Sequence, residues 1–162
     1  MQPVKSWEIT TITTVKDLVR AGKSMPGAML PILHGIQEAI GYIPSDAVPI
    51  IADELNVSQA EVHGVITYYH HFRQEPSGKR LVQLCRAEAC QARGADELVA
   101  HAKAVLGCDF HETTADGEVT LEPVYCLGQC AVGPNMTIGD ELHARITPEK
   151  FDTLINAKRV AK

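Results

Sequence analysis

The sequence lacks any run of apolar residues long enough to cross a membrane. A spanning helix needs roughly 18 or more consecutive apolar residues, and no stretch of this chain approaches that length. Residues 1–18 mix Lys, Glu, Asp and Thr with short apolar runs, so they also lack the apolar core of a secretion signal. From these absences we expect a cytoplasmic protein with no membrane span.

The chain also lacks several common binding and catalytic patterns. It has no G-x-G-x-x-G run, no P-loop and no recognisable Ser/His/Asp set. Its 15 Lys and Arg are outnumbered by 20 Asp and Glu, and the two signs are interspersed rather than gathered into one basic face. We therefore expect no nucleotide site, no catalytic residues in this chain alone and no nucleic-acid partner.

What is present is enough apolar material for one or two small domains. The chain has 162 residues, of which 45% are hydrophobic, so it can bury a core. A polar, turn-rich segment at residues 74–79 is the best candidate for a domain boundary. We predict one domain from 1 to 76 and a second from 77 to 162.

The first of these domains has helical spacing and no strand-like alternation. Apolar residues recur at helical spacing in 15–19, 28–40 and 48–55. Thr14 and Asp17 resemble a helix-capping box, and Ser58 with Glu61 forms an S-x-x-E box ahead of a further apolar stripe. Residues 1–76 are therefore predicted to form a helical bundle.

The second domain alternates strands with helices. The segments with strand composition are 81–84, 110–113, 119–124, 136–138 and 142–146. Two hairpin turns are expected at Asp116-Gly117 and Gly139-Asp140. One helix should end at Gly107, and another should begin at Pro148 after the N-cap Thr147. This order predicts a small two-layer α/β domain.

Four of the five cysteines fall into two close pairs. Four residues separate Cys85 from Cys90, and three separate Cys126 from Cys130. Cytoplasmic thiols stay reduced, so clustered cysteines there more often bind metal or do redox chemistry than form disulfides. All four lie in predicted loops that leave strand ends, where a rigid framework can direct them to one point. Cys108 has no partner at a matching spacing, and we expect it to be a packing residue.

The spacing of the pairs favours an iron–sulfur cluster over zinc. Structural zinc sites use C-x2-C turns around one small ion, whereas longer gaps suit a cluster with two irons that each take two thiolates. The small residues Gly128, Ala131 and Gly133 would let backbone N–H groups approach the cluster sulfides. A zinc site, four buried unligated cysteines and two disulfides remain as alternatives. A dithiol enzyme would need C-x-x-C, which is missing.

Two other features invite functional interpretations. His70 and His71 suggest a metal or haem ligand pair, but no second spaced pair accompanies them. We expect them to bond the carbonyls at a helix end instead. Trp7 precedes the first predicted helix and is either loosely packed or a contact for a partner.

Several motifs resemble those of a known family. The stretches 85–90, 95–98 and 126–130 resemble the thioredoxin-like [2Fe–2S] ferredoxins, and more closely the 24-kilodalton subunits of NADH:ubiquinone oxidoreductase. The resemblance extends into the helical half and spans roughly residues 25 to 158. It implies a thioredoxin-like [2Fe–2S] ferredoxin domain after an N-terminal helical bundle. Stretches 69–73, 85–90 and 111–117 look most like the gamma subunits of soluble NAD-dependent formate dehydrogenases.

By this resemblance Cys85 and Cys90 would ligate one iron of a [2Fe–2S] cluster, and Cys126 and Cys130 the other. The chain would carry electrons in an NAD-dependent formate dehydrogenase complex. Its partners would be a flavin- and NAD-binding subunit and a large formate-oxidising subunit, which would hold the FMN, the NAD and a molybdenum or tungsten cofactor. Residues 86–89 depart from the Thr- and Pro-containing loops of the respiratory subunits, which favours the formate enzyme.

Two groups of alternatives to this function remain. The chain resembles, almost as well, the equivalent subunit of respiratory complex I or of an NAD-coupled hydrogenase. A different class of function is a zinc-stabilised scaffold. In either electron-transfer case the helical half would be a docking surface, with a candidate strip at Tyr68, Tyr69, Phe72 and Arg73, because aromatic and Arg residues are enriched at interfaces. The alternative for Tyr69 and Phe72 is that they close the core of the bundle.

Overall fold

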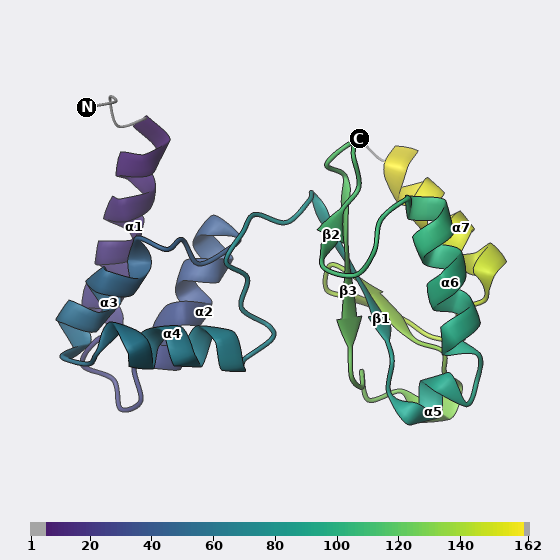
Figure 1. Cartoon of the computed structure of the whole chain (residues 1–162), viewed down its shortest axis with the longest axis horizontal. Coiled ribbons are helices and arrows are strands. Elements are labelled where there is room, and N and C mark those ends of the chain that lie inside the picture. Colours follow the sequence, from purple (N-terminus) through teal and green to yellow (C-terminus); the bar gives the residue numbers. More distant parts are fainter. Residues whose placement is uncertain (1–5, 161–162) are drawn as a thin grey trace. The chain divides into compact units, whose positions relative to one another are not determined.

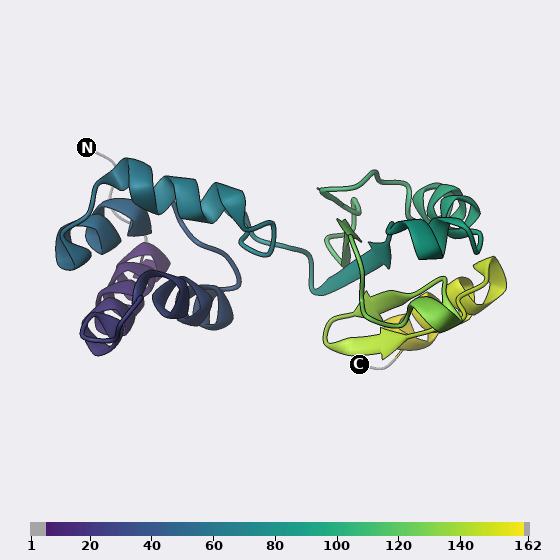
Figure 2. The ribbon, with the colours of Figure 1, turned by 90° about the horizontal axis from the view of Figure 1, so that it is seen from below.

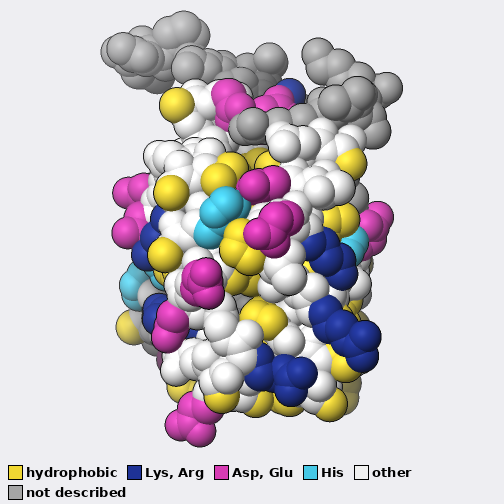
Figure 3. Space-filling view, turned by 90° about the vertical axis from the view of Figure 1, so that its right-hand side faces the viewer, with side chains coloured by type: hydrophobic (Ala, Val, Ile, Leu, Met, Phe, Trp, Pro, Cys, Tyr) yellow, Lys and Arg dark blue, Asp and Glu magenta, His cyan; other side chains and the backbone are white. Residues whose placement is uncertain are grey.

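The computed structural model describes residues 6–160, with the side chains of 10–157. The chain divides into two compact units, Met1–Pro76 and Ser77–Lys162. Figure 1 shows helices in the first unit and a sheet with helices in the second. Within the described residues, no helix is both long and apolar enough to cross a membrane. On the face in Figure 3, acidic and basic side chains are interspersed with apolar ones.

The helical unit has four helices in its described part, α1 Ser6–Gly22, α2 Met29–Ile40, α3 Ala47–Leu55 and α4 Gln59–Tyr68. Helix α1 begins before Thr14, whose hydroxyl donates to the carbonyl of Thr10 within the helix (3.0 Å). The predicted capping box at Thr14 and Asp17 is therefore wrong. Trp7 belongs to α1 rather than to an arm ahead of it, and its side chain lies outside the described residues.

The apolar stripes of the four helices meet in one core. Its fully buried members are Val15, Val19, Leu33, Ile36, Ile43, Ile51 and Val62. Each such aliphatic side chain contributes roughly 1.5–3 kcal/mol by leaving water. The capping box at Ser58 and Glu61 is present with both of its hydrogen bonds, as predicted, and it fixes the start of α4.

The second unit is built on a five-stranded sheet, with β1 Arg80–Cys85, β2 Glu112–Thr113, β3 Val119–Val124, β4 Met136–Ile138 and β5 Glu141–His143. The strand order is β2-β3-β1-β4-β5. Strands β1 and β3 are parallel, and the other neighbouring pairs are antiparallel. Helix α6, Ala95–Leu106, lies in the connection between the parallel strands β1 and β3 (Figures 1 and 2).

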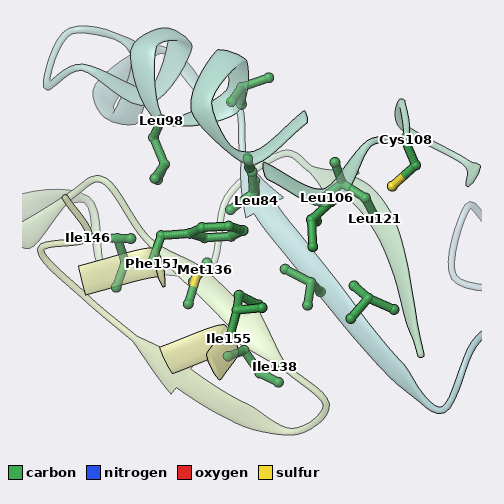
Figure 4. Packing of buried hydrophobic residues seen from close by; sticks show 14 residues of the cluster. Leu84, Leu98, Leu106, Cys108, Leu121, Met136, Ile138, Ile146, Phe151 and Ile155 are labelled. Atoms are coloured by element: carbon green, nitrogen blue, oxygen red, sulfur yellow. The ribbon is translucent and has the colours of Figure 1, made fainter. Parts of the chain in front are cut away.

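One face of the sheet packs against two helices, α6 and α7 (Pro148–Val160). In register on that face lie Val82 of β1, Leu121 of β3 and Ile138 of β4. Figure 4 shows the ring of Phe151 from α7 between Leu98 of α6 and Met136 of β4. The alternate residues are polar: the Thr137 hydroxyl donates to Gln83 Oε1 (3.1 Å). This alternation is typical of a sheet that is covered on one face.

The structure also departs from the predicted elements in length. The segment 142–146 was expected to be a strand, but β5 ends at His143, and Ile146 is buried in the core outside it. The expected strand 110–113 is reduced to two residues in β2. Two short elements were not predicted, α5 (Glu88–Gln91) and the 3-10 helix η1 (Cys130–Val132). Both of them carry a candidate cysteine.

Candidate functional site

The sheet brings the two cysteine pairs to one end. Cys85 is the last residue of β1, and it pairs with Val124, the last residue of β3. Because β1 and β3 are parallel, the segments that follow them leave the sheet at the same end. One segment carries Cys90 and the other carries Cys126 and Cys130.

Three of the four cysteines lie in regular structure rather than in the predicted loops. Cys90 lies on α5, and Cys130 is the first residue of η1. Of the four, only Cys126 lies in irregular chain, just beyond β3. The expectation of four loop positions is therefore wrong for Cys90 and Cys130, and also for Cys85, which is still part of β1. The expectation that all four approach one point stays a prediction, which is favoured by the shared end of the sheet from which both segments leave.

The four thiols interact with one another across the two segments. The sulfur atoms of Cys126 and Cys130 are 3.5 Å apart. Burial, hydrogen bonding with Cys85 and the charge of Cys130 all raise the pKa of the Cys90 thiol. Cys130 in turn interacts with Cys85. The two pairs therefore form a single cluster of sulfur atoms rather than two separate sites.

Exposure divides this cluster into a buried pair and an accessible pair. Cys85 and Cys90 are buried, whereas Cys126 is exposed and Cys130 is half-buried. Burial raises the pKa of the Cys90 thiol, because the thiolate loses its hydration. The backbone N–H of Gly128 donates to Cys126 (N to Sγ 3.4 Å) and lowers the pKa of that thiol. Thiolate therefore forms most readily at Cys126, whose hydrogen bond and charge in turn raise the pKa of the Cys130 thiol.

The chain around Cys126 is held in an unusual backbone conformation. Cys126 has φ +100°, and Gly128 has φ +80°. A positive φ is rare for a residue with a Cβ and is sustained only where the surrounding structure imposes it, at roughly 1–3 kcal/mol. Such outliers concentrate at functional sites. In this conformation the Cys126 sulfur lies 3.5 Å from that of Cys130 and accepts from the N–H of Gly128.

Gly133 and Asn135, which follow η1, complete the buried side of the cluster. A Cβ on Gly133 would lie only 3.1 Å from the sulfur of Cys90, so glycine lets the backbone approach this sulfur without crowding it. Asn135 is 1% exposed, and its side-chain amide nitrogen lies 3.6 Å from the same sulfur. Sequence analysis missed Asn135. Its only sequence signal was a polar residue set between a proline and a short apolar strand.

The donor set fits a two-iron cluster. Four thiolates are soft ligands, which iron–sulfur clusters and zinc both accept. Among the described residues, no three His, Cys, Asp or Glu side chains converge as ligands of a single ion. The four thiols are instead arranged as two pairs, and each iron of a [2Fe–2S] cluster takes one pair.

The other sequence candidates are accounted for by packing and hydrogen bonds. Cys108 belongs to the core of the sheet unit, where burial raises the pKa of its thiol; Figure 4 shows it at the edge of that core. The ring Nδ1 of His70 lies 3.2 Å from the carbonyl of Tyr68, the last residue of α4. The prediction of a packing cysteine is supported, and so is the helix-end prediction for His70. The ring of His71 instead packs against those of His34 and Phe72.

The predicted aromatic and basic strip is divided between surface and core. Tyr68 is 75% exposed and Tyr69 is 43% exposed, whereas Phe72 is 7% exposed and belongs to the bundle core. Arg73 donates from Nε to the carbonyl of Gly41 (3.3 Å). The core alternative is therefore correct for Phe72, whereas Tyr68 and Tyr69 are accessible and their docking role stays a prediction. The accessible part borders an open hollow of about 450 Å³ that also includes Met29 and Val65.

Comparison with known proteins identifies a family. Residues 15–159 match the profile of the thioredoxin-like [2Fe–2S] ferredoxins. The HndA chain of the NADP-reducing hydrogenase from Solidesulfovibrio fructosivorans is 32% identical over 143 residues, which cover 86% of this chain and 84% of that one. A subunit of the NADH-quinone oxidoreductase from Escherichia coli K12 is 34% identical over 128 residues, which cover 79% of this chain and 77% of that one.

The fold is also similar to that of a solved enzyme. A crystal structure of an air-oxidized NAD⁺-reducing [NiFe]-hydrogenase superposes with a TM-score of 0.66 at 18% identity. The match covers 79% of this chain but only 23% of that longer chain, and at this identity it shows the fold alone. Together with the family match, it confirms the predicted α/β class, with N-terminal helices followed by a thioredoxin-like ferredoxin fold.

Proposed function

The chain belongs to the thioredoxin-like [2Fe–2S] ferredoxin family, and from that premise we propose that Cys85, Cys90, Cys126 and Cys130 hold its [2Fe–2S] cluster. The observation that carries this assignment is the meeting of the two thiol pairs at one end of the sheet. Cys108, the remaining cysteine, is packed into the core instead. The family membership favours this cofactor over the alternative of a zinc-stabilised scaffold.

The cluster supplies one-electron chemistry, and the chain sets its surroundings. Cys85 and Cys90 would present two buried thiolates on one side, and Cys126 and Cys130 two accessible ones on the other. The N–H of Gly128 donates to the Cys126 sulfur, and such bonds tune reduction potential. Because Cys126 is exposed, the cluster would lie close to the protein surface, where an electron can pass to a partner.

Single Cys→Ser variants test the assignment of the ligands. Each of the variants at positions 85, 90, 126 and 130 should lose or strongly change the visible absorption of the [2Fe–2S] cluster, because a hard hydroxyl replaces a soft thiolate. Cys108→Ser is the matched control and should keep the parent spectrum. A colourless, zinc-containing parent protein would favour the scaffold alternative. Loss of the cluster in Cys108→Ser, with a native spectrum in one of the other four, would contradict the assignment.

The biological role that follows is electron transfer inside a larger oxidoreductase. We propose that the chain is the [2Fe–2S] subunit of a cytoplasmic NAD-dependent formate dehydrogenase, next to the flavin- and NAD-binding subunit. The support is the likeness of residues 69–73, 85–90 and 111–117 to the gamma subunits of such enzymes. In that complex a large subunit with a molybdenum or tungsten cofactor would oxidise formate, and electrons would reach FMN and then NAD⁺.

A second candidate has support of equal weight. The relatives compared above are subunits of an NADP-reducing hydrogenase and of NADH-quinone oxidoreductase. The chain would then be the equivalent subunit of a hydrogenase complex or of respiratory complex I. Both candidates share the same local role for this chain, which is to place a [2Fe–2S] cluster beside a flavin-binding partner.

Purification from the native host separates the candidates. A tagged copy of the chain should co-purify with its complex, and the eluate is assayed with formate, hydrogen and NADH as electron donors. Formate-dependent reduction of NAD⁺ would support the formate dehydrogenase. Hydrogen-dependent reduction would support the hydrogenase, and quinone reduction by NADH without formate turnover would support complex I.

We further propose that the helical unit docks the flavin-binding partner through the hollow beside α4. Tyr68 and Tyr69 are large, accessible aromatic side chains, and apolar Met29 and Val65 line the same hollow. Aromatic residues of this kind are enriched at interface centres. Tyr68→Ser should weaken retention of the flavin-binding subunit in the purification described above, whereas Leu142→Ser on β5, another accessible apolar site, should not. Equal retention in both variants would exclude this surface.

A further inference from the structure

Asn135 connects the three chain segments that carry the candidate ligands. Its backbone carbonyl accepts a hydrogen bond from the N–H of Cys85 (3.0 Å). Its side-chain Nδ2 donates to the carbonyl of Gln129, next to Cys130 (2.7 Å). The same nitrogen lies 3.6 Å from the sulfur of Cys90. One buried residue therefore touches β1, α5 and the segment between Cys126 and Cys130.

The hydrogen-bonding capacity of the amide fixes its orientation. The carbonyl of Gln129 can only accept, so the nitrogen of the Asn135 amide, not its oxygen, must face it. An amide nitrogen carries two N–H groups. With one of them committed to Gln129, the second is directed at the sulfur of Cys90. Both donors of this side chain are thus used at the cysteine site.

The acceptor of the same amide is unpaired. Within the described structure, Oδ1 of Asn135 is buried without a hydrogen-bond partner, and an unpaired buried acceptor lowers stability. A leucine of similar size would fill the space without that penalty. Core packing alone therefore favours an apolar residue here, and the amide is better explained by what its donors do.

We propose that Asn135 is a positioning residue that raises the reduction potential of the cluster. Its N–H groups hold the Cys90 thiolate and the segment that carries Cys126 and Cys130. Reduction adds one electron to the cluster and increases the negative charge on its thiolates. A donor at the Cys90 sulfur binds the reduced state more strongly than the oxidised state, which shifts the potential upward. This inference rests on the proposed ligand role of the four cysteines.

The test compares Asn135→Leu with Thr137→Val, a control on the adjacent strand β4. Thr137 is also buried and also gives up one side-chain hydrogen bond in its variant, but its partner is Gln83 rather than a thiol. The midpoint potential is measured by stepwise reduction of the loaded protein with optical detection. The free energy of unfolding of the cluster-free protein is measured in parallel. Asn135→Ser, with a hydroxyl donor in less space, is carried through the same measurements.

We expect a lower potential in Asn135→Leu than in the parent and in Thr137→Val, with Asn135→Ser at or between these values. A fully loaded Asn135→Leu variant with the parent potential would overturn the proposal. If neither variant loads a cluster, unchanged unfolding of the cluster-free protein would support the positioning role. Unfolded cluster-free variants would instead make Asn135 a support of the fold alone and overturn it. A parent protein without a [2Fe–2S] spectrum would refute the ligand assignment itself, which is a separate result.

Discussion

The two units of the chain each bury one side-chain amide, among the described residues, and they use it differently. Gln37 in the helical unit is 5% exposed, and its Nε2 donates to the carbonyl of His71 (2.8 Å). Its Oε1 accepts from the N–H of Arg73 (2.7 Å). Asn135 in the sheet unit uses both of its donors at the cysteines but leaves its acceptor unpaired.

This difference separates an amide that serves folding from one that serves chemistry. The pairing of Gln37 on both sides recovers its desolvation cost and ties the segment after α4 to helix α2. The incomplete pairing of Asn135 costs stability at the place where four thiols meet. Proteins depart from the rules of good packing mainly at functional sites. The helical unit thus follows those rules at its buried amide, and the sheet unit departs from them beside Cys90.

Separating the two units should have the largest effect of these changes, which is loss of binding to the flavin-binding partner. A fragment of residues 77–162 contains all four candidate ligands and the strands that position them, so we predict that it folds and keeps the visible spectrum of the cluster. It should lose retention of the flavin-binding partner, because the proposed docking surface is absent. Limited proteolysis of the full chain should cut within residues 74–79, whose polar side chains mark an exposed connection. A cluster-free, unfolded fragment would show instead that the helical unit completes the core.

Removing the structural amide should destabilise the helical unit strongly. Gln37→Leu leaves the carbonyl of His71 and the N–H of Arg73 without their partners. At roughly 1–3 kcal/mol for each of the two unpaired groups, we expect a loss of about 2–6 kcal/mol in the free energy of unfolding. Denaturant unfolding followed by far-ultraviolet circular dichroism measures this loss. The cluster potential should be unchanged, in contrast to Asn135→Leu, and a shifted potential would break the distinction between the two amides.

A glycine substitution at the cysteine site should have a smaller effect on stability and a specific effect on the cluster. Gly128 has φ +80° with open space around its Cα, so Gly128→Ala acts through backbone strain alone, at roughly 1–2 kcal/mol. Strain that moves the Gly128 N–H away from Cys126 should also alter the visible spectrum.

Gly139 provides the matched control for that substitution. It also has a positive φ (+58°) and open surroundings. It follows β4 at the end of the sheet opposite the cysteines, where it bonds the carbonyl of Leu81. Gly139→Ala should lower stability by a similar amount and leave the spectrum intact. Equal spectra in both variants would mean that the loop conformation around Cys126 does not shape the cluster.

Sequence analysis predicted most of the elements and the four cysteines, for identifiable physical reasons. Apolar periodicity and the signals at Ser58, Gly107 and Thr147 are local, and the structure uses each of them. The start of α1 was missed because the local sequence around Thr14 matches a helix-cap pattern, whereas Thr14 lies within a longer helix.

The parts of the site that could not be predicted depend on contacts between distant segments. The bond from Asn135 to Cys90 joins residues that are 45 positions apart, and no local pattern encodes it. The positive φ of Cys126 likewise has no local signal, since a residue with a Cβ rarely adopts it. Spacing identified the two pairs of cysteines. Only the register of β1 with β3 shows that both pairs leave the sheet at the same end.

The smallest expected effect concerns the cap of α4, which lies far in sequence from every candidate ligand. Ser58 accepts from the N–H of Glu61 through its hydroxyl (3.1 Å), so Ser58→Ala should cost about 1 kcal/mol of the stability of the helical unit.

The N–H and hydroxyl of Ser58 in return donate to the Glu61 carboxylate and lower its pKa. The folded-state pKa is thus below the unfolded one, so the carboxylate contributes stability above the unfolded pKa and loses it as pH falls through the folded pKa. Part of the Ser58→Ala effect should therefore disappear in acid, because the hydroxyl then faces a neutral carboxyl group. Unfolding experiments at neutral pH and below pH ~4 measure the difference; an effect that stays equal at both pH values would show that the cap acts through the Glu61 N–H alone.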